Sequence, residues 1–540
     1  MSITAPTIRF CLLTALLALP AARDARAADQ VTTDRGIVEG AMLASGVRAF
    51  KGIPFAAPPV GELRWKAPQP AAKWDGVRKA ETFGPACMQR AVFGDMEFRS
   101  KGTSEDCLYL NVWTPATSGG EKLPVLVYFF GGGLIAGDGS ELRYDGESMA
   151  RRGIVSVTIN YRLNVFGFMA HPELSAEAPY KASGNYGYLD QRAALQWVRQ
   201  NIAAFGGDPA RVTIAGESAG ARSAAAQVVS PLSKGLFMQA ILQSGSVVTA
   251  TDPLPLAEAE TLGVRFMEMA GAANLKALRA MPAAQVLAIT ADPKAPRFVN
   301  VADDYLLPSR DLVAYMDAGQ QARVPVLLGT NSAEQQPRAI LGDNPPTPEG
   351  FAAAVRKTFG ANADRVLALY NGKTEDEVLD AAMALASDQW MAYGAWRFAD
   401  SHQKGSGQPV YRYYYTRPRP KFLGAADQAA GVAGGIVTTT APQAPPRGAV
   451  HSAEIEYALG TLATNTHYAW EDGDRTVSQT MQSYFANFIK TGNPNGPGLP
   501  TWPTDAEKGG FQVMQIDVES KVIPDQRARY LLLNEILRKK

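Results

Sequence analysis

A serine flanked by glycines stands where a β-strand is expected to turn into a helix. Residues 216–220 read Gly-Glu-Ser-Ala-Gly, with the β-like run VTIA before them and a helix-prone run after them. This G-x-S-x-G context is typical of a nucleophile elbow, in which a tight turn holds the serine in a strained conformation at the carboxyl edge of a sheet. The pattern predicts a nucleophile at Ser218, with the backbone N–H of Ala219 facing a developing oxyanion.

A serine hydroxyl needs a base, and the base needs an orienting acid. In the strand–elbow–helix arrangement the chain order is serine, acid, histidine. Only His402, His451 and His467 follow Ser218. His451 follows a Gly/Pro-rich stretch at a loop-to-helix junction and is the favoured base, whereas His402 is expected to face solvent and His467 to be a packed polar residue.

The best acid candidate is Glu334, which follows the strand-like run VPVLLGTNSA. A carboxylate just past the carboxyl end of a parallel strand lies on the same edge of the sheet as the elbow. A helix-capping role for Glu334 is equally compatible with the spacing alone. Three glycines at 131–133 end another buried strand, and their N–H groups are expected to complete an oxyanion hole.

These residues require a sheet that brings distant strand ends together. The runs 122–130, 154–161, 212–215, 237–242 and 324–328 are expected strands, and residues 189–205 have helical spacing. Their alternation predicts an α/β fold with a mostly parallel sheet covered by helices. Helical insertions are expected between about 250 and 400, a long mobile surface loop at 424–449, and no further domain boundary within 28–540.

The charge balance argues against a nucleic-acid partner. The 540 residues contain 53 Lys+Arg and 52 Asp+Glu, which gives a formal net charge of +1, and phosphate binding needs a basic surplus. With 46% hydrophobic and 19% charged residues, a disordered chain is not expected. The 3 Cys and 4 His are too few and too scattered to suggest a metal cluster.

The first 27 residues have the pattern of a secretory signal peptide. Arg9 precedes the apolar run 10–22, and Ala25-Arg26-Ala27 forms a cleavage site. A membrane anchor is the alternative, but the run is short for a bilayer span. After cleavage we expect a periplasmic or secreted protein without a membrane segment. Cys87 and Cys107 would then meet an oxidising compartment and pair, although two inert thiols are the alternative.

Many motifs together resemble the type-B carboxylesterase/cholinesterase family of α/β-hydrolases, over nearly all of residues 30–535. They are FKGIPFAAPPVGELRW at 50–65, EDCLYLNVWTP at 105–115, FFGGG at 129–133, NYRLNVFGF at 160–168, GNYGYLDQ at 184–191, FGGDP at 205–209, GESAG at 216–220, LQSGS at 242–246, GTNSAE at 329–334, VHSAEIEYALG at 450–460 and FIKTGNPN at 488–495.

This resemblance implies the site residues of a carboxylic-ester hydrolase. It implies a triad of Ser218, Glu334 and His451, and hydrolysis of small-molecule esters at the bottom of a deep gorge without metal or organic cofactor. It further implies that the hydroxyl of Ser244 supports the triad from behind and that Cys87 and Cys107 form a disulfide. The oxyanion hole would be formed by the N–H groups of Gly132, Gly133 and Ala219.

The sequence departs from the family pattern near the expected substrate. Phe130 replaces the usual His or Tyr before the glycines, Leu134 replaces the usual aromatic residue after them, and Gln335 stands where Gly is common. No catalytic group is lost, but Phe130 and Leu134 are expected to change the walls around the acyl or alcohol moiety. A choline-binding aromatic gorge is not evident, so acetylcholine is not the expected substrate.

Arg222 lies one helical turn after Ser218 and is a candidate for binding a substrate carboxylate. The acyl group would then be a polycarboxylic acid, and the resemblance to esterases that remove tricarballylic side chains implies tricarballylic acid as one such acid. An internal salt bridge, for example with Glu217, or simple packing is the alternative. For the whole chain, the competing hypotheses are a broad-specificity carboxylesterase for neutral esters, an amidase or lipase, and a non-catalytic binding protein on the same fold. The oligomeric state is left open.

Overall fold

The computed structural model describes residues 1–2, 29–249, 253–423, 447–505 and 512–538. Nearly all of the expected signal peptide and most of the expected loop at 424–449 therefore lie outside the described residues. Among the described residues, no helix has both the length and the apolar character needed to cross a bilayer.

One large sheet dominates the described residues. Its eleven strands run in the order β18-β17-β16-β15-β12-β11-β9-β10-β8-β4-β3. The strands are β3 Ala41–Met42, β4 Arg48–Pro54, β8 Tyr109–Thr114, β9 Leu123–Phe129, β10 Val155–Ile159, β11 Gly207–Glu217, β12 Gln239–Gln243, β15 Val326–Asn331, β16 Val410–Tyr415, β17 Gln512–Ile516 and β18 Lys521–Pro524. From β10 to β17 all neighbours pair in parallel, and the pairs outside this block are antiparallel.

The parallel strands form because their sequences can be buried on both faces. In β9 six of seven residues are buried, and in β10 all five are, as expected for strands covered by helices on either side. Shorter pairings lie outside the main sheet. They are β1 Gln30–Thr32 with β2 Ile37–Glu39 and β5 Val77–Lys79, β6 Ala86–Cys87 with β7 Thr103–Ser104, and β13 Leu254–Pro255 with β14 Val301–Ala302.

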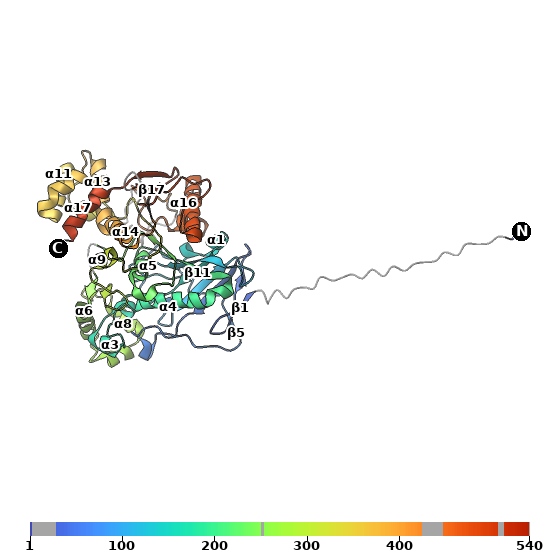
Figure 1. The fold of residues 1–540 in the computed structure, drawn as a ribbon. Coiled ribbons are helices and arrows are strands. Elements are labelled where there is room, and N and C mark those ends of the chain that lie inside the picture. The colour runs from blue at the N-terminus through green and yellow to red at the C-terminus, as the bar shows by residue number, and fades with distance from the viewer. Residues whose placement is uncertain (3–28, 250–252, 424–446, 506–511, 539–540) are drawn as a thin grey trace.

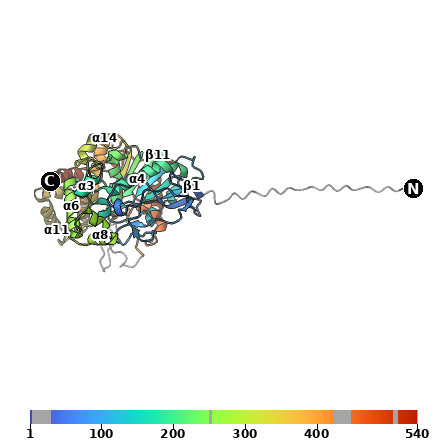
Figure 2. The same cartoon turned by 90° about the horizontal axis from the view of Figure 1, so that it is seen from below.

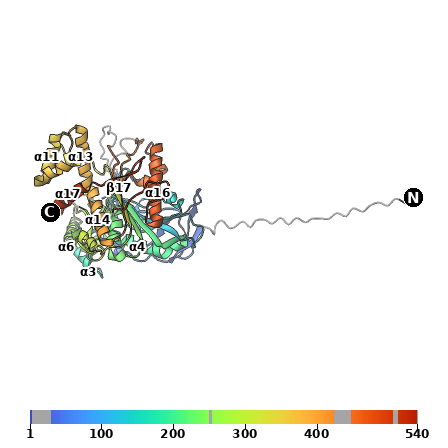
Figure 3. The same ribbon diagram turned by 45° about the horizontal axis from the view of Figure 1, so that its top comes forward.

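Helices cover the sheet and extend beyond it. They are α1 Glu147–Ala150, α2 Asn164–Phe168, α3 Pro172–Glu177, α4 Tyr186–Asn201, α5 Ala219–Val229, α6 Leu256–Met269, α7 Leu275–Ala280, α8 Ala283–Ile289, α9 Leu312–Asp317, α10 Arg338–Leu341, α11 Pro348–Phe359, α12 Ala363–Leu369, α13 Glu375–Ser387, α14 Tyr393–Ser406, α15 Ile455–Leu459, α16 Asp472–Thr491 and α17 Arg527–Leu537. Figures 1 and 3 show α4 and α16 separated by the sheet.

The inserted helices form two groups. Figures 1 and 2 show α3, α6 and α8 close to one another, and Phe266 of α6 belongs to the main hydrophobic core. Helices α11, α13 and α17 gather at another end of the molecule (Figures 1 and 3) and contribute to a separate apolar cluster that includes Val355 and Leu533. The helical insertions expected between about 250 and 400 are present.

The α/β fold class predicted from the sequence is confirmed, and the differences lie at element ends. The expected helix at 189–205 begins earlier, at Tyr186, and its last turn, Ile202–Phe205, is a 3₁₀ turn. That turn ends at Gly206, whose φ of 84° favours glycine. The expected strand at 212–215 is the inner part of the longer β11.

Candidate active site

Ser218 occupies the sharp turn between β11 and α5. Its φ and ψ of 56° and −118° are strained for a residue with a Cβ. The flanking glycines make this turn possible, since a Cβ on Gly220 would lie 2.0 Å from the carbonyl oxygen of Phe129 and one on Gly216 would lie 2.6 Å from the same atom. The elbow therefore packs directly on the carboxyl end of β9, as the G-x-S-x-G pattern predicts.

Two hydrogen bonds join the serine, the histidine and the glutamate. Ser218 Oγ lies 2.8 Å from Nε2 of His451, and Nδ1 of the same imidazole lies 2.6 Å from Glu334 Oε2. His451 and Glu334 are 2% and 1% exposed, while Ser218 is half-buried. The three side chains form one contact path from a shielded carboxylate to the hydroxyl of the half-buried Ser218.

The acid and the histidine meet because their segments lie side by side. Ala333 pairs with Val450 in a parallel β-bridge, and its N–H donates to the carbonyl of Ala449 at 2.8 Å. Glu334 follows β15 at its carboxyl end, and its Oε1 accepts from the N–H of Asn331 at 2.7 Å. This second hydrogen bond orients the carboxylate toward the imidazole, so the acid role is favoured over helix capping.

A second carboxyl group, that of Glu217, faces the imidazole. Its Oε1 lies 3.3 Å from His451 Nε2, and the side chain is buried. Burial raises the pKa of Glu217 well above its ordinary value. Burial alone would lower the pKa of His451, but Glu217 and Glu334 outweigh it and raise that pKa above its usual value. Sequence reasoning missed Glu217 as a site residue, although it is the variable position of the G-x-S-x-G pattern.

The expected oxyanion-hole residues lie beside the serine. A Cβ on Gly131 would lie 3.4 Å from Ser218 Cβ, which places the glycine run against the elbow. Gly132 and Gly133 have φ of 108° and 65°, and Ala219 is the first residue of α5. Within the described residues, no hydrogen bond is formed by the N–H groups of Gly132, Gly133 or Ala219. Unpartnered N–H groups of this kind suit an oxyanion.

Ser244 lies behind the three contacting residues Ser218, His451 and Glu334 and is not one of them. It is fully buried, its φ is 48°, and its hydroxyl lies 3.5 Å from Glu454 Oε1. The other oxygen of Glu454 accepts from the Asn331 side chain at 2.6 Å. Burial raises the pKa of Glu454 to about 7. Because Asn331 also donates from its backbone to Glu334, this network links Ser244 to the acid.

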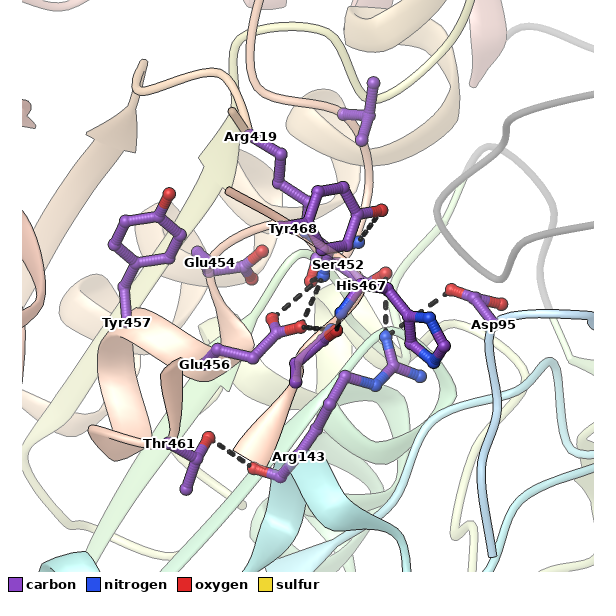
Figure 4. A network of polar contacts seen from close by, with 12 residues as sticks. Asp95, Arg143, Arg419, Ser452, Glu454, Glu456, Tyr457, Thr461, His467 and Tyr468 are labelled. Carbon is purple, nitrogen blue, oxygen red and sulfur yellow. Dashed lines mark hydrogen bonds and ion pairs between the residues drawn. The ribbon is translucent and has the colours of Figure 1, made fainter. Parts of the chain in front are cut away.

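Two buried arginines hold the residue that follows the histidine. Arg419 Nη2 donates to the carbonyl of Ser452 at 3.0 Å and to Glu456 Oε2 at 2.8 Å. Arg143 Nη1 lies 3.5 Å from the Ser452 hydroxyl, as Figure 4 shows. Ser452 has a φ of 63°, a backbone conformation that needs support from its surroundings. This network fixes the backbone next to His451.

The expected substrate-side residues have different surroundings. The Phe130 ring is buried and stacks on Tyr161, with ring centroids 4.2 Å apart. Leu134 is also buried and has a φ of 63°. Arg222 is half-buried on α5, and its Nε has no hydrogen-bond partner among the described residues. The salt bridge with Glu217 that the sequence allowed is not present there.

The two remaining histidines after the serine lie outside the triad. His402 is fully buried, and its Nε2 lies 2.8 Å from the carbonyl oxygen of Val324. The expectation that it faces solvent is wrong, because residues 401–406 continue helix α14 instead of forming a turn. Burial lowers the pKa of His402 to about 4. His467 is partly exposed and contacts Glu97.

The cysteines that follow the expected leader form a disulfide. Cys87 and Cys107 are bonded, with Cα atoms 5.0 Å apart, and both are buried. The loop that they close reaches the segment just after the glycine run, since the amide of Gln89 donates to the carbonyl of Gly137 at 2.9 Å and accepts from its N–H at 2.8 Å. The expected pairing of Cys87 and Cys107 is therefore confirmed, and the alternative of two inert thiols is wrong.

Comparisons with known proteins agree with this arrangement. A family model described as Carboxylesterase family matches residues 27–531. A fumonisin B1 esterase from Sphingopyxis macrogoltabida is 35% identical over 90% of this chain and 86% of its own length. The para-nitrobenzyl esterase of Bacillus subtilis is 33% identical over 88% of this chain and 93% of its own length.

The fold also matches solved structures over most of the chain. The carboxylesterase EST55 of Geobacillus stearothermophilus superimposes with a TM-score of 0.77 at 30% identity, covering 94% of this chain and 99% of that one. Together with the elbow and the buried Ser218–His451–Glu334 contacts, these findings identify the class of the protein. The chain belongs to the carboxylesterase family and is a carboxylic-ester hydrolase with an α/β-hydrolase fold.

Proposed function

We propose that the protein hydrolyses its ester through an acyl-enzyme, with Ser218 as nucleophile, His451 as general base and Glu334 as the acid that orients it. The observation that carries this proposal is the pair of contacts at His451, 2.8 Å to Ser218 Oγ and 2.6 Å to Glu334 Oε2. A histidine held in this way can accept a proton on Nε2 while Nδ1 stays directed at a carboxylate.

In the first step Ser218 Oγ attacks the ester carbonyl carbon while its proton passes to His451 Nε2. The negative charge on the carbonyl oxygen is received by the N–H groups of Gly132, Gly133 and Ala219. The carbon–oxygen bond to the alcohol then breaks, and the proton on Nε2 goes to the departing oxygen. In the second step water attacks the acyl carbon while its proton passes to His451 Nε2. The bond from the acyl carbon to Ser218 Oγ then breaks, the proton returns from Nε2 to Oγ, and the carboxylic acid leaves with Ser218 restored.

We also propose that the acyl group carries free carboxylates, as tricarballylate side chains of fumonisin-type esters do. Support comes from Arg222, one turn after Ser218 on α5, whose Nε is buried without a hydrogen-bond partner among the described residues. A guanidinium left without an internal partner favours an anion from outside. The similarity to a fumonisin B1 esterase at 35% identity agrees with this choice.

A broad-specificity esterase for neutral esters is the second candidate. It is favoured by the apolar side chains on both sides of the glycine run, Phe130 and Leu134, and by the 33% identity to a para-nitrobenzyl esterase. The two candidates differ in what Arg222 does, since a neutral acyl group gains nothing from a guanidinium.

The experiment compares matched 4-nitrophenyl esters of a neutral and an anionic acid, such as butyrate and hemisuccinate, on three variants. We expect Ser218→Ala to abolish turnover of both esters without unfolding. Arg222→Met should reduce kcat/KM for the anionic ester about 10- to 100-fold more than for the neutral ester.

The control for Arg222→Met is Arg192→Met. Arg192 is a half-buried residue of α4 whose guanidinium donates to the carbonyl of Leu232. This control should change both esters alike. Equal losses for both esters in Arg222→Met would support the broad-specificity candidate. Full activity in Ser218→Ala would overturn the acyl-enzyme proposal itself.

We propose further that the protein is exported, to the periplasm or the medium, after cleavage behind residue 27. The A-x-A pattern at 25–27 and the disulfide Cys87–Cys107 support this. N-terminal sequencing of the exported protein checks it, with Ala28 expected as the first residue.

A further inference from the structure

A tryptophan with no role in the triad lies on the catalytic imidazole. The Trp390 side chain is 42% exposed, which is unusual for the largest apolar side chain. Its ring centroid lies 4.6 Å from that of His451, with the planes inclined by 54°. This separation is within the range in which an aromatic ring stabilises a cation. No feature of the sequence pointed to Trp390.

An irregular turn in a long helix delivers this side chain. Residues Asp388–Ala392 form a π-helical turn between α13 and α14. A π turn inserts residues into the helix and rotates the following side chains, and such turns are frequent at functional sites. Here the inserted turn contains Trp390 and directs its ring to His451.

Buried contacts fix the start of this turn. Asp388 is buried, and its Oδ2 accepts from the hydroxyl of Tyr370 at 2.7 Å. The preceding residue, Ser387, accepts from the N–H of Gln335 at 3.1 Å. Since Gln335 follows Glu334, the same turn is tied to the acid segment. The indole, the imidazole and the carboxylate are therefore held by one connected piece of structure.

We propose that Trp390 is a positioning residue for His451, which restrains the imidazole between Ser218 and Glu334 and stabilises the imidazolium formed during each proton transfer. This inference rests on the proposed function, because it takes His451 as the base. Restraint matters because a small misplacement of a reacting group costs a large part of the rate. Stabilisation matters because the imidazolium exists only while the proton is in transit.

Three carboxyl groups raise the pKa of the imidazole against the lowering effect of its burial, and the Trp390 ring lies beside it. Glu217 extends from the end of β11, Glu334 follows β15, Glu454 precedes α15, and Trp390 adds its ring from the π turn. The three carboxyl groups remain when the indole is removed. Loss of the ring should therefore destabilise only the cation and move the acid limb of the kcat/KM profile toward lower pH.

The test measures kcat, KM and the pH profile with the neutral ester 4-nitrophenyl acetate. Trp390→Leu should lower kcat about 3- to 30-fold with little change in KM, and shift the acid limb to lower pH. Trp390→Phe, which keeps a ring, should recover part of both effects. The matched control is Trp74→Leu, which removes a half-buried tryptophan whose indole N–H donates to the carbonyl of Ile37. Both residues are far in the sequence from Ser218, Glu334 and His451. This control should leave kcat and the acid limb unchanged.

A double-mutant cycle separates positioning from general stability. Tyr370→Phe removes the hydroxyl that holds Asp388 and keeps the ring. It should reduce kcat in the wild-type background and have no further effect in Trp390→Leu, because both changes act through the same side chain. Additive effects, or a Trp390→Leu variant that alters only KM, would overturn the positioning role. Full activity in Ser218→Ala would instead overturn the proposed function on which it rests.

Discussion

Glu334 and His451 are 117 residues apart in the chain, yet Oε2 of the one lies 2.6 Å from Nδ1 of the other. The β-bridge between their neighbours Ala333 and Val450 sets the two segments in register. The N–H of Asn331 then holds the second carboxylate oxygen at 2.7 Å. The carboxylate is thus held from both sides before any substrate arrives, and under the proposed function this lowers the reorganisation that proton transfer requires.

Replacing this carboxylate by an amide tests its charge without changing its shape. Glu334→Gln can still contact both partners, but it loses the charge that stabilises the imidazolium and it can favour the wrong tautomer. We expect kcat to fall about 100- to 10,000-fold with KM nearly unchanged. Steady-state kinetics on a neutral ester measures this. A loss smaller than threefold would show that Glu334 is not the orienting acid.

The pH profile should reflect the raised pKa of His451. Protonated His451 cannot accept the Ser218 proton, so kcat/KM should increase as pH rises through that pKa, which Glu217 and Glu334 hold above 6.5. The Glu217 carboxyl lies 3.3 Å from His451 Nε2 and raises the pKa of the imidazole, so Glu217→Gln should move the acid limb to lower pH. An acid limb at or below pH 6.5 that this variant leaves in place would contradict the arrangement.

Gly220, the second residue after Ser218, should tolerate no side chain. A Cβ on Gly220 would stand 2.0 Å from the Phe129 carbonyl oxygen, so Gly220→Ala must displace either the elbow or β9. We expect loss of activity together with a lower melting temperature. Gly120→Ala is the control, because nothing lies within 4 Å of its Cβ position. If both variants behave alike, the close packing of the elbow on β9 is not a constraint.

Removal of the disulfide should destabilise the fold and leave the chemistry in place. The Cys87–Cys107 bridge closes a loop with a sequence separation of 20, and a loop of that size corresponds to about 3 kcal/mol in the free energy of unfolding. Urea unfolding of a Cys87→Ser, Cys107→Ser double variant measures the change. Reduced wild-type protein should unfold at the same urea concentration as the variant. If the unfolding midpoint is unchanged in both, the disulfide does not contribute to the stability of the fold.

Local rules predicted part of the framework of the site. The expected strand ends, the elbow at Ser218 and the serine–acid–histidine order favoured His451 and made Glu334 a candidate, because carboxyl ends of parallel strands share one edge, but helix capping by Glu334 stayed open until the family resemblance implied the triad. Buried strands such as β9 are recognisable from continuous apolar runs. These features depend on short stretches of sequence, which is why they could be found without coordinates.

Features that depend on packing between distant segments could not be predicted. The polar neighbours of His402 suggested a solvent-facing turn, but the residue lies inside α14, where its ring stacks on Phe398 one helical turn earlier. Trp390 reaches His451 only because a π turn interrupts the helix, and a one-turn irregularity leaves no periodic signal. The carboxyl of Glu217 gains its place only once the glycine run packs against it.

The most direct measurement is covalent labelling with an organophosphonate, followed by intact mass and peptide mapping. The predicted result is one adduct per chain, on Ser218, with complete loss of esterase activity and no label in the Ser218→Ala variant. A fully inactivated protein that carries its adduct on another residue, or an active protein that carries the adduct on Ser218, would contradict Ser218 as the nucleophile.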